Sequence, residues 1–236
     1  PTYKEGDKIP FIIHPHGGPN ARDYWGYNPE VQFYATRGYG VIQMDYRGST
    51  GYGREEMILA NHQMGKKMQE DKYDALMWAN EQGYVDMDNV CISGASYGGY
   101  AAMQAATKNP ELFKCIIAYV GVYDLTSMDL RGLRWSDLGM PMEYIEKGDP
   151  RDPDDYKNLY ENSPLFFAEN VEDPILIITG RRDNQVRFQE TVDMVMLCIV
   201  KEVGILLKEY IIIVLLLCLI LQQELQVMYI LSLIHI

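Results

Sequence analysis

The segment GASYGG at 94–99 contains the spacing G-x-S-x-G, which points to acyl transfer by a serine nucleophile. Such a serine needs a sharp turn between a strand and a helix, and glycines two residues to either side relieve the crowding that the turn causes. A short apolar run at 90–93 precedes the motif, and a segment rich in Ala and Met at 98–108 follows it. A chance match would lack this strand-then-helix context. Ser96 is therefore the predicted nucleophile.

Acyl transfer also needs hydrogen-bond donors for the negative charge that develops on the carbonyl oxygen. The backbone amide of Tyr97, the residue after Ser96, is the first expected donor. A second donor usually comes from a loop after an earlier strand, and the segment HPHGGP at 14–19 follows the first apolar run of the chain. Its glycines would let the backbone approach a substrate closely, so we expect the second donor at Gly18 or Gly17. The alternative is a simple Gly-Pro turn with incidental histidines.

Short apolar runs that alternate with longer segments of helical spacing must position these groups. Strands are predicted at 11–15, 40–46, 90–93, 115–120 and 175–179, and helices at 29–37, 71–82 and 98–108. Hydrophobicity at 115–120 and 175–179 is continuous rather than alternating, which indicates a parallel sheet covered by helices on both faces. Residues 124–174 are richer in charge and proline, and they are predicted to form an irregular or helical insertion over the sheet.

Composition narrows the possible functions. The 236 residues are enough for one large domain, and the net charge of −12 leaves no basic face to neutralise phosphates, which argues against nucleic-acid binding. Four cysteines lie in apolar runs without a close pair. We expect them to be buried, reduced thiols rather than a disulfide or metal framework; they are Cys91, Cys115, Cys198 and Cys218.

Three segments together resemble the prolyl-oligopeptidase family of serine peptidases, in particular its acylaminoacyl-peptidase and dipeptidyl-peptidase-like branch. They are HPHGGP at 14–19, DYRGSTGYG at 45–53 and GASYGGYAAM at 94–103, and the resemblance extends over about residues 9–203. It implies an α/β-hydrolase fold, a three-layer αβα sandwich with a mainly parallel sheet, here incomplete at its C-terminal end. It also implies an upstream β-propeller, a short peptide or acyl-peptide substrate, and no metal or organic cofactor.

The family's catalytic acid follows a late strand in the pattern G-x-x-D-x-x-V, and GRRDNQV at 180–186 matches that pattern. The resemblance thus assigns the acid to Asp183. Its position after the strand at 175–179 and after Ser96 fits the hydrolase order Ser…Asp…His. The acid would hold a histidine in the correct tautomer and stabilise its imidazolium. The alternative is a solvated loop carboxylate paired with a neighbouring arginine.

No histidine is assignable as the catalytic base. His14 and His16 belong to the candidate oxyanion loop, and His62 lies in a polar stretch that indicates a surface position. His235, the second-last residue, would have to fold back over the strand ends. The resemblance implies a base about thirty residues after the acid, in a Gly-rich loop, whereas the corresponding stretch at 210–221 has neither Gly nor His.

Residues 205–236 differ in composition from the rest, because Ile and Leu dominate and Gly, Pro and Asp are absent. The uninterrupted apolar run falls short of the ~20 residues that span a bilayer. A frame or assembly artefact is therefore favoured over a membrane segment, and the terminal LSLIHI resembles a translated library adapter. We expect residues 1–204 to be a catalytic domain, with 124–174 as a cap-like insertion. We also expect the chain to begin inside a longer protein, so the sequence leaves a cytoplasmic and a periplasmic location equally open.

The leading hypothesis is a serine-type peptidase that hydrolyses peptide bonds through an acyl-enzyme, inactive as written because the base is missing. One alternative is a carboxylesterase or another acyl hydrolase, since the fold does not fix the substrate. A second alternative is a non-catalytic fragment, which the missing histidine favours.

Overall fold

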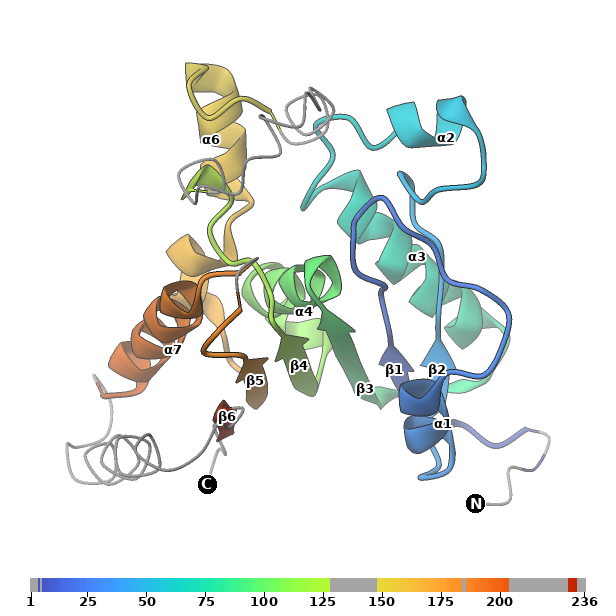
Figure 1. Ribbon diagram of the computed structural model, residues 1–236. Coiled ribbons are helices and arrows are strands. Elements are labelled where there is room, and N and C mark those ends of the chain that lie inside the picture. Colours follow the sequence, from blue (N-terminus) through green and yellow to red (C-terminus); the bar gives the residue numbers. More distant parts are fainter. Residues whose placement is uncertain (1–3, 5, 128–147, 184–185, 204–228, 233–236) are drawn as a thin grey trace.

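A single mixed sheet organises the chain. The computed structural model describes residues 4, 6–127, 148–183, 186–203 and 229–232 (Figure 1). Within these residues the sheet has six strands in the order β2-β1-β3-β4-β5-β6. Their bounds are β1 Ile9–Ile13, β2 Gly40–Ile42, β3 Val85–Ala95, β4 Cys115–Tyr119, β5 Ile175–Thr179 and β6 Tyr229–Ser232. The first five strands run parallel, and β6 is antiparallel to β5. The predicted, mainly parallel sheet is thus confirmed.

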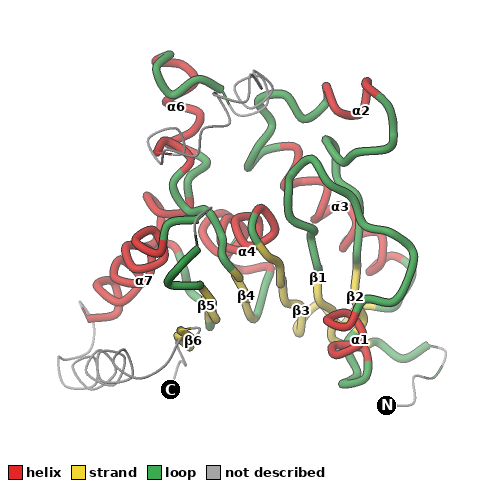
Figure 2. Tube along the Cα trace, in the orientation of Figure 1, coloured by secondary structure: helices red, strands yellow, loops and turns green. Residues whose placement is uncertain are grey.

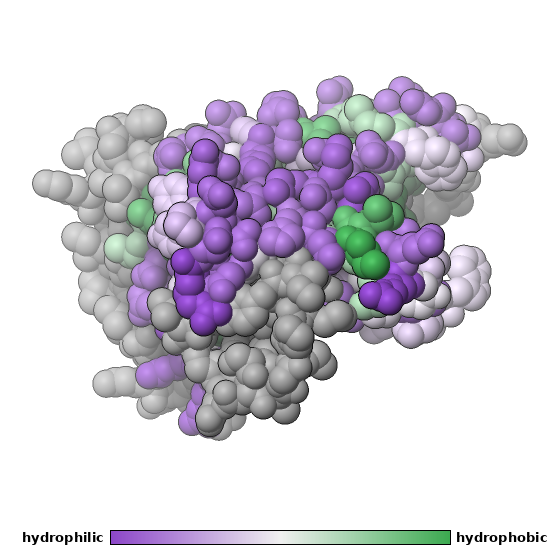
Figure 3. All heavy atoms as spheres, turned by 90° about the horizontal axis from the view of Figure 1, so that it is seen from above, coloured by the Kyte–Doolittle hydropathy of each residue, from purple (hydrophilic) through white to green (hydrophobic). Residues whose placement is uncertain are grey.

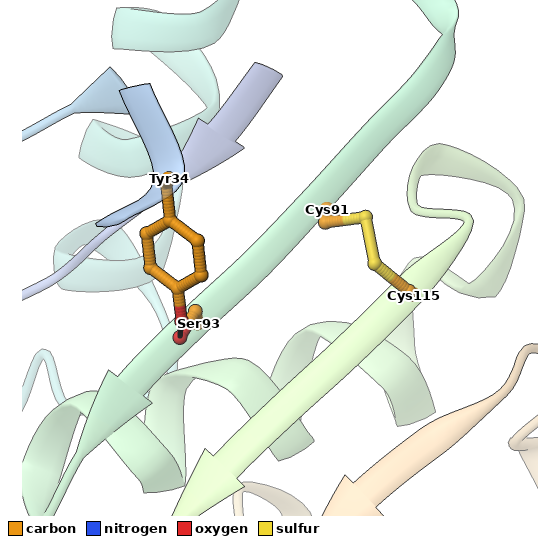
Figure 4. Close-up of a disulfide and its surroundings, with 4 residues drawn as sticks. All are labelled: Tyr34, Cys91, Ser93 and Cys115. Carbon is orange, nitrogen blue, oxygen red and sulfur yellow. Dashed lines mark hydrogen bonds between the residues drawn. A yellow bond between two sulfur atoms is a disulfide. The ribbon is translucent and has the colours of Figure 1, made fainter. Parts of the chain in front are cut away.

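Helices cover both faces of this sheet. Their bounds are α1 Pro29–Ala35, α2 Arg54–Ile58, α3 Lys67–Glu81, α4 Tyr97–Lys108, α6 Pro153–Glu161 and α7 Phe188–Val203. Side chains of α3, α4 and α7 share one buried apolar cluster with Ile92 of β3. The next residue, Ser93, points to the other face, where its hydroxyl lies 2.9 Å from the hydroxyl of Tyr34 in α1 (Figure 4). The three-layer arrangement is therefore confirmed.

Local sequence explains where α1 begins. The Asn28 side chain accepts hydrogen bonds from the amides of Glu30 and Val31, at 2.9 and 3.2 Å, and Pro29 occupies the first helical position. A side-chain cap followed by proline is a strong start signal, because both satisfy or remove amides that have no partner within the helix. The helix lies within the predicted range of 29–37.

The predicted insertion at 124–174 is described only in part. The 3-10 helix η2 (Leu125–Ser127), α6 and the 3-10 helix η4 (Pro164–Asn170) are described, whereas 128–147 lies outside the described residues. In Figure 1, α6 lies above the edge at which the parallel strands end. The role of a cap stays a prediction.

Two cysteines contradict the expectation of reduced thiols. Cys91 of β3 and Cys115 of β4 are directly paired in the sheet, with 4.7 Å between their Cα atoms, and they form a disulfide (Figure 4). The two cysteines are 24 residues apart, so no close cysteine pair in the sequence signals this bond. The crossover through α4 brings them together. Cys198 is a buried thiol outside this disulfide, as expected, and Cys218 lies outside the described residues.

The apolar C-terminal region is described only at β6, so its proposed origin as an artefact is untested. Residues 204–228 and 233–236 lie outside the described part. Among the helices that are described, none combines the length and the hydrophobicity required to cross a bilayer.

A second buried cluster lies between α3 and α4 and contains Tyr46, Met68, Tyr97 and Tyr100. Lys72 of α3 is fully buried against this cluster. Burial lowers the pKa of its ammonium from the usual 10.5 to about 7, although the neighbouring Asp71 acts in the opposite direction. The unfolded chain therefore binds a proton at pH values where the folded chain has lost it, and stability is expected to rise with pH between these two pKa values.

Replacing Lys72 with methionine should stabilise the protein, most strongly below pH 7. The gain should shrink as the pH approaches 10.5, by an amount on the order of 5 kcal/mol, because the folded-state and unfolded-state pKa values differ by 10.5 minus about 7. Urea unfolding of wild type and Lys72→Met at pH 6 and pH 10 measures this difference. Lys67→Met on the exposed start of α3 is the matched control, and equal pH slopes for wild type and Lys72→Met would contradict the prediction.

Candidate active site

Ser96 occupies a strained turn between β3 and α4. Its backbone angles are φ 56° and ψ −117°, a conformation that few residues other than glycine adopt. Its amide donates to the carbonyl oxygen of Tyr119 at 2.9 Å, and its own carbonyl accepts from the amide of Tyr100 at 2.9 Å. Neighbouring strand and helix thus hold the turn from both sides, and the residue stays partly exposed.

The glycines around Ser96 allow close backbone contacts. A Cβ atom on Gly94 would lie 2.7 Å from the carbonyl carbon of Gly98, which is closer than real Cβ atoms approach. A Cβ atom on Gly98 would overlap the carbonyl oxygen of Pro15. Gly98 therefore does more than permit the turn, because it also allows the loop after β1 to lie against the start of α4.

Replacing Gly98 with alanine should lower the free energy of unfolding by about 1–3 kcal/mol, the usual cost of forcing an extra methyl group into a packed site. Gly26→Ala is the matched control, because a Cβ atom there meets nothing within 4 Å and should change stability by no more than about 0.5 kcal/mol. Denaturant unfolding of both variants gives the comparison. Equal stabilities would show that the loop can move away from α4 without cost.

The loop after β1 places the two glycines predicted as oxyanion donors differently. A Cβ atom on Gly17 would lie 3.4 Å from the Cβ atom of Ser96, so this residue lies directly beside the turn. Gly18 has a positive φ of 131° and precedes the cis peptide bond to Pro19. Tyr97 begins α4 immediately after Ser96. Gly17 and Tyr97 thus both adjoin Ser96 at the carboxyl end of β3, whereas the role of any amide as an oxyanion donor stays a prediction.

Histidines of this loop make contacts that fix the loop itself. In His16, Nδ1 lies 2.7 Å from the carbonyl oxygen of Gly17, and Nε2 lies 3.0 Å from the hydroxyl of Ser49. Nδ1 of His14, which is buried, lies 2.9 Å from the carbonyl oxygen of Ser93. Both rings bridge segments that are distant in sequence, which is a structural role.

The remaining histidines lie elsewhere. His62 is 45% exposed at its side chain and has Nδ1 3.2 Å from Oδ1 of Asp155. His235 lies outside the described residues. Ser232, the last residue described, pairs with Leu176 near the amino end of β5, which is the edge opposite Ser96. Within the described residues, the base therefore remains unassigned.

Asp183 follows the carboxyl end of β5. Its amide donates to the carbonyl oxygen of Gly180 at 3.1 Å, and its Oδ1 accepts from the amide of Val186 at 2.9 Å. Strands β3 and β5 are parallel with β4 between them (Figure 2). Because Ser96 and Asp183 each follow the carboxyl end of one of these strands, they lie at the same edge of the sheet, and two strand spacings place the strand ends roughly 10 Å apart.

An ion pair that the sequence did not reveal supports the loop after β2. The Arg47 guanidinium donates to both oxygens of Asp71, with Nε–Oδ2 at 2.8 Å and Nη2–Oδ1 at 2.6 Å. Burial alone would raise the pKa of Asp71, but the hydrogen bonds and charge of Arg47 outweigh that effect and lower it. This contact anchors the RGST segment to α3.

The surface at the carboxyl edge is mostly hydrophilic. Figure 3 looks down on the molecule from the side of this edge, and the described residues there are predominantly polar, with a compact hydrophobic area among them. Ile58 and Leu59, at the end of α2, are 49% and 53% exposed. Among the described residues, no group of three or more His, Cys, Asp or Glu side chains is arranged to hold a metal ion.

Comparison with known sequences identifies relatives over most of the chain. The pattern of the Prolyl oligopeptidase family matches residues 25–210. Dipeptidyl aminopeptidase BIII of Pseudoxanthomonas mexicana is 38% identical over 186 residues, which cover 78% of this chain and 27% of that protein. Dipeptidyl peptidase family member 6 of Caenorhabditis elegans is 37% identical over 182 residues, covering 76% and 24%. The chain thus spans about a quarter of the length of these relatives.

Comparison with solved structures agrees. A puromycin-hydrolyzing peptidase of Mycobacterium tuberculosis matches with a TM-score of 0.76 and 29% identity, over 84% of this chain and 29% of that one. An acylaminoacyl peptidase matches with a TM-score of 0.74 and 28% identity, over 84% and 31%. Because the family pattern covers most of the sequence and solved relatives share its parallel sheet, this chain belongs to the prolyl oligopeptidase family and carries part of an α/β-hydrolase fold.

Proposed function

We propose that this chain is the catalytic segment of a serine peptidase that cleaves peptide bonds through an acyl-enzyme. The observation that carries the proposal is the strained turn at Ser96, with φ 56° between β3 and α4. Strain of this kind persists where the surrounding structure enforces it, and it is common at nucleophiles. The turn also directs the amino end of α4, with its free amides and positive dipole, toward the reacting group.

In the proposed reaction, the hydroxyl of Ser96 attacks the peptide carbonyl carbon while an imidazole takes up its proton. The amide of Tyr97 and that of Gly17 or Gly18 donate to the resulting oxyanion. The imidazolium then gives its proton to the leaving amine, and the C–N bond breaks. Water, deprotonated by the same imidazole, hydrolyses the ester and frees Ser96. Asp183 orients the imidazole, a role to which no histidine of this chain is assigned.

The proposed class of substrate is inferred from the names of the relatives. Two of them are named for the removal of dipeptides, and a solved neighbour is named an acylaminoacyl peptidase. These names support short peptides, cleaved near a free or acylated amino terminus, as substrates. Because the chain covers only 27% and 24% of the two dipeptidyl relatives, we propose that it belongs to a longer protein with an upstream β-propeller that restricts access.

A chimera tests the proposal. Residues 25–203 would replace the matching segment of dipeptidyl aminopeptidase BIII, which then supplies the upstream region and the C-terminal ending. We expect hydrolysis of a dipeptidyl p-nitroanilide at a rate well above the uncatalysed one. Turnover of p-nitrophenyl acetate without turnover of the anilide would favour an esterase. A folded chimera that hydrolyses neither would favour a non-catalytic role.

A further inference from the structure

The buried Lys72 lies against the rings of Tyr46 and Tyr97, and each of these rings adjoins a segment with a candidate oxyanion donor. Its Nζ donates to the carbonyl oxygen of Met68 at 2.5 Å within α3. The same nitrogen lies 3.9 Å from the ring centroid of Tyr46 and 5.3 Å from that of Tyr97. An ammonium over an aromatic face is attracted by the ring, and the attraction is strongest where water is excluded. Lys72 is fully buried, so this condition is met.

The ring of Tyr46 connects Lys72 to the loop after β1. It stacks on the ring of His16 with centroids 4.3 Å apart. Its hydroxyl donates to the carbonyl oxygen of His16 at 3.0 Å and lies 3.1 Å from Nδ1 of the same residue. The same Nδ1 atom of His16 also lies 2.7 Å from the carbonyl oxygen of Gly17. Tyr46 thus holds the backbone of this loop beside Ser96.

The ring of Tyr97 connects Lys72 to the turn itself. Tyr97 follows Ser96 directly, and its ring centroid lies 5.2 Å from that of Tyr46 and 5.5 Å from that of Tyr100. The backbone amide of the same residue is the first candidate donor, so the packing of this ring restrains the residue that carries that donor. Lys72 is therefore in contact with both sides of the same small site.

We propose that Lys72 is a positioning residue, whose ammonium holds the rings of Tyr46 and Tyr97 together and so sets the distance between the amides of Tyr97 and Gly17. The effect of this positioning on catalysis depends on the proposed function, but the positioning itself does not. The Asp71 carboxylate, the acidic group next to it on α3, is engaged by Arg47. The ammonium therefore makes its close contacts with the two rings and the carbonyl of Met68, while Asp71 acts on it through its charge.

Titration of Lys72 makes the proposal measurable near neutral pH. Burial lowers the pKa of its ammonium to about 7. Burial also raises the pKa of Tyr46 well above its usual range, so this ring stays neutral. His16 stacks on the other side of Tyr46, with its Nε2 3.5 Å from Oδ1 of Asp45, so further ionisable side chains lie near this ring. Loss of the Lys72 charge as the pH rises should weaken the hold on both rings.

Nuclear magnetic resonance of the chain, with 13C-labelled lysine and 15N-labelled amides, tests this between pH 5.5 and 8.5. We expect the Tyr97 amide to shift with the same midpoint as the Lys72 Cε signal. In Lys72→Met this shift should disappear, and in Lys72→Arg the amide should stay at its low-pH position throughout. Lys67→Met, on the exposed part of the same helix, should behave as wild type.

Three results would overturn the proposal. One is a Tyr97 amide that does not titrate in the wild type. Another is a pH-dependent shift that persists in Lys72→Met, which would show that a group other than Lys72 causes it. The third is a pair of different midpoints for Tyr97 and Lys72 in the wild type, a comparison that needs no variant. No turnover is required, so these results stand whether or not the peptidase proposal succeeds.

Discussion

Ser96→Ala is expected to lower kcat/KM for a dipeptidyl p-nitroanilide by about 10⁶ in the chimera that carries residues 25–203. Alanine removes the oxygen that would form the acyl-enzyme, while the oxyanion donors remain. Since a methyl side chain fits where a hydroxymethyl group stood, the turn at φ 56° should persist and the protein should stay folded. Steady-state kinetics, with circular dichroism as the check on folding, measures the effect.

Ser93→Ala is the matched control for this variant. Ser93 lies in β3, three residues before Ser96, and is buried. Its hydroxyl lies 2.9 Å from that of Tyr34 (Figure 4). Its loss should cost about 1 kcal/mol of stability, the usual contribution of one hydrogen bond, with kcat/KM within tenfold of the parent. If Ser96→Ala retained comparable activity, Ser96 would not be the nucleophile.

Much of the sheet could be predicted from local pattern, because its inner strands are continuous apolar runs. The strand at 175–179 coincides with β5. By contrast, β3 begins at Val85, five residues before the predicted run at 90–93. The added residues include Asp86, Asp88 and Asn89, which sequence preference keeps out of strands. Pairing of Val85 with Ile9 of β1 overrides that preference, and such a tertiary contact has no local signal.

In the candidate site, too, features encoded by neighbouring residues could be predicted, whereas features that depend on tertiary contacts could not. The turn at Ser96 could be predicted because its glycines and the following helix are encoded within a few residues. Neither the Cys91–Cys115 disulfide nor the burial of Lys72 could be, since both depend on elements brought together by the fold. Lysine at a helical position usually indicates a solvated face. The burial of Lys72 depends on the rings of Tyr46 and Tyr97, which the fold places beside it.

Asp183→Asn should lower kcat/KM in the same chimera by about 10⁴, which would be the second-largest effect after that of Ser96. Asparagine keeps an oxygen that can accept from the amide of Val186, so the loop should survive. What it loses is the negative charge that would stabilise an imidazolium and select the correct tautomer. The measurement is kcat/KM for the dipeptidyl anilide, with the urea midpoint as the check on folding.

Asp173→Asn separates this role from a general effect of removing one carboxylate. Asp173 lies just before β5 and therefore at the opposite edge of the sheet from Ser96. Its replacement should leave kcat/KM within a factor of about two, the range expected for a surface change of 0.5 kcal/mol. Similar small losses in both variants would mean that Asp183 is a solvated loop carboxylate, and the acid would have to come from elsewhere. A large loss at 183 alone requires a cation-forming partner at the carboxyl edge, since a carboxylate contributes to this chemistry only through the group that it orients.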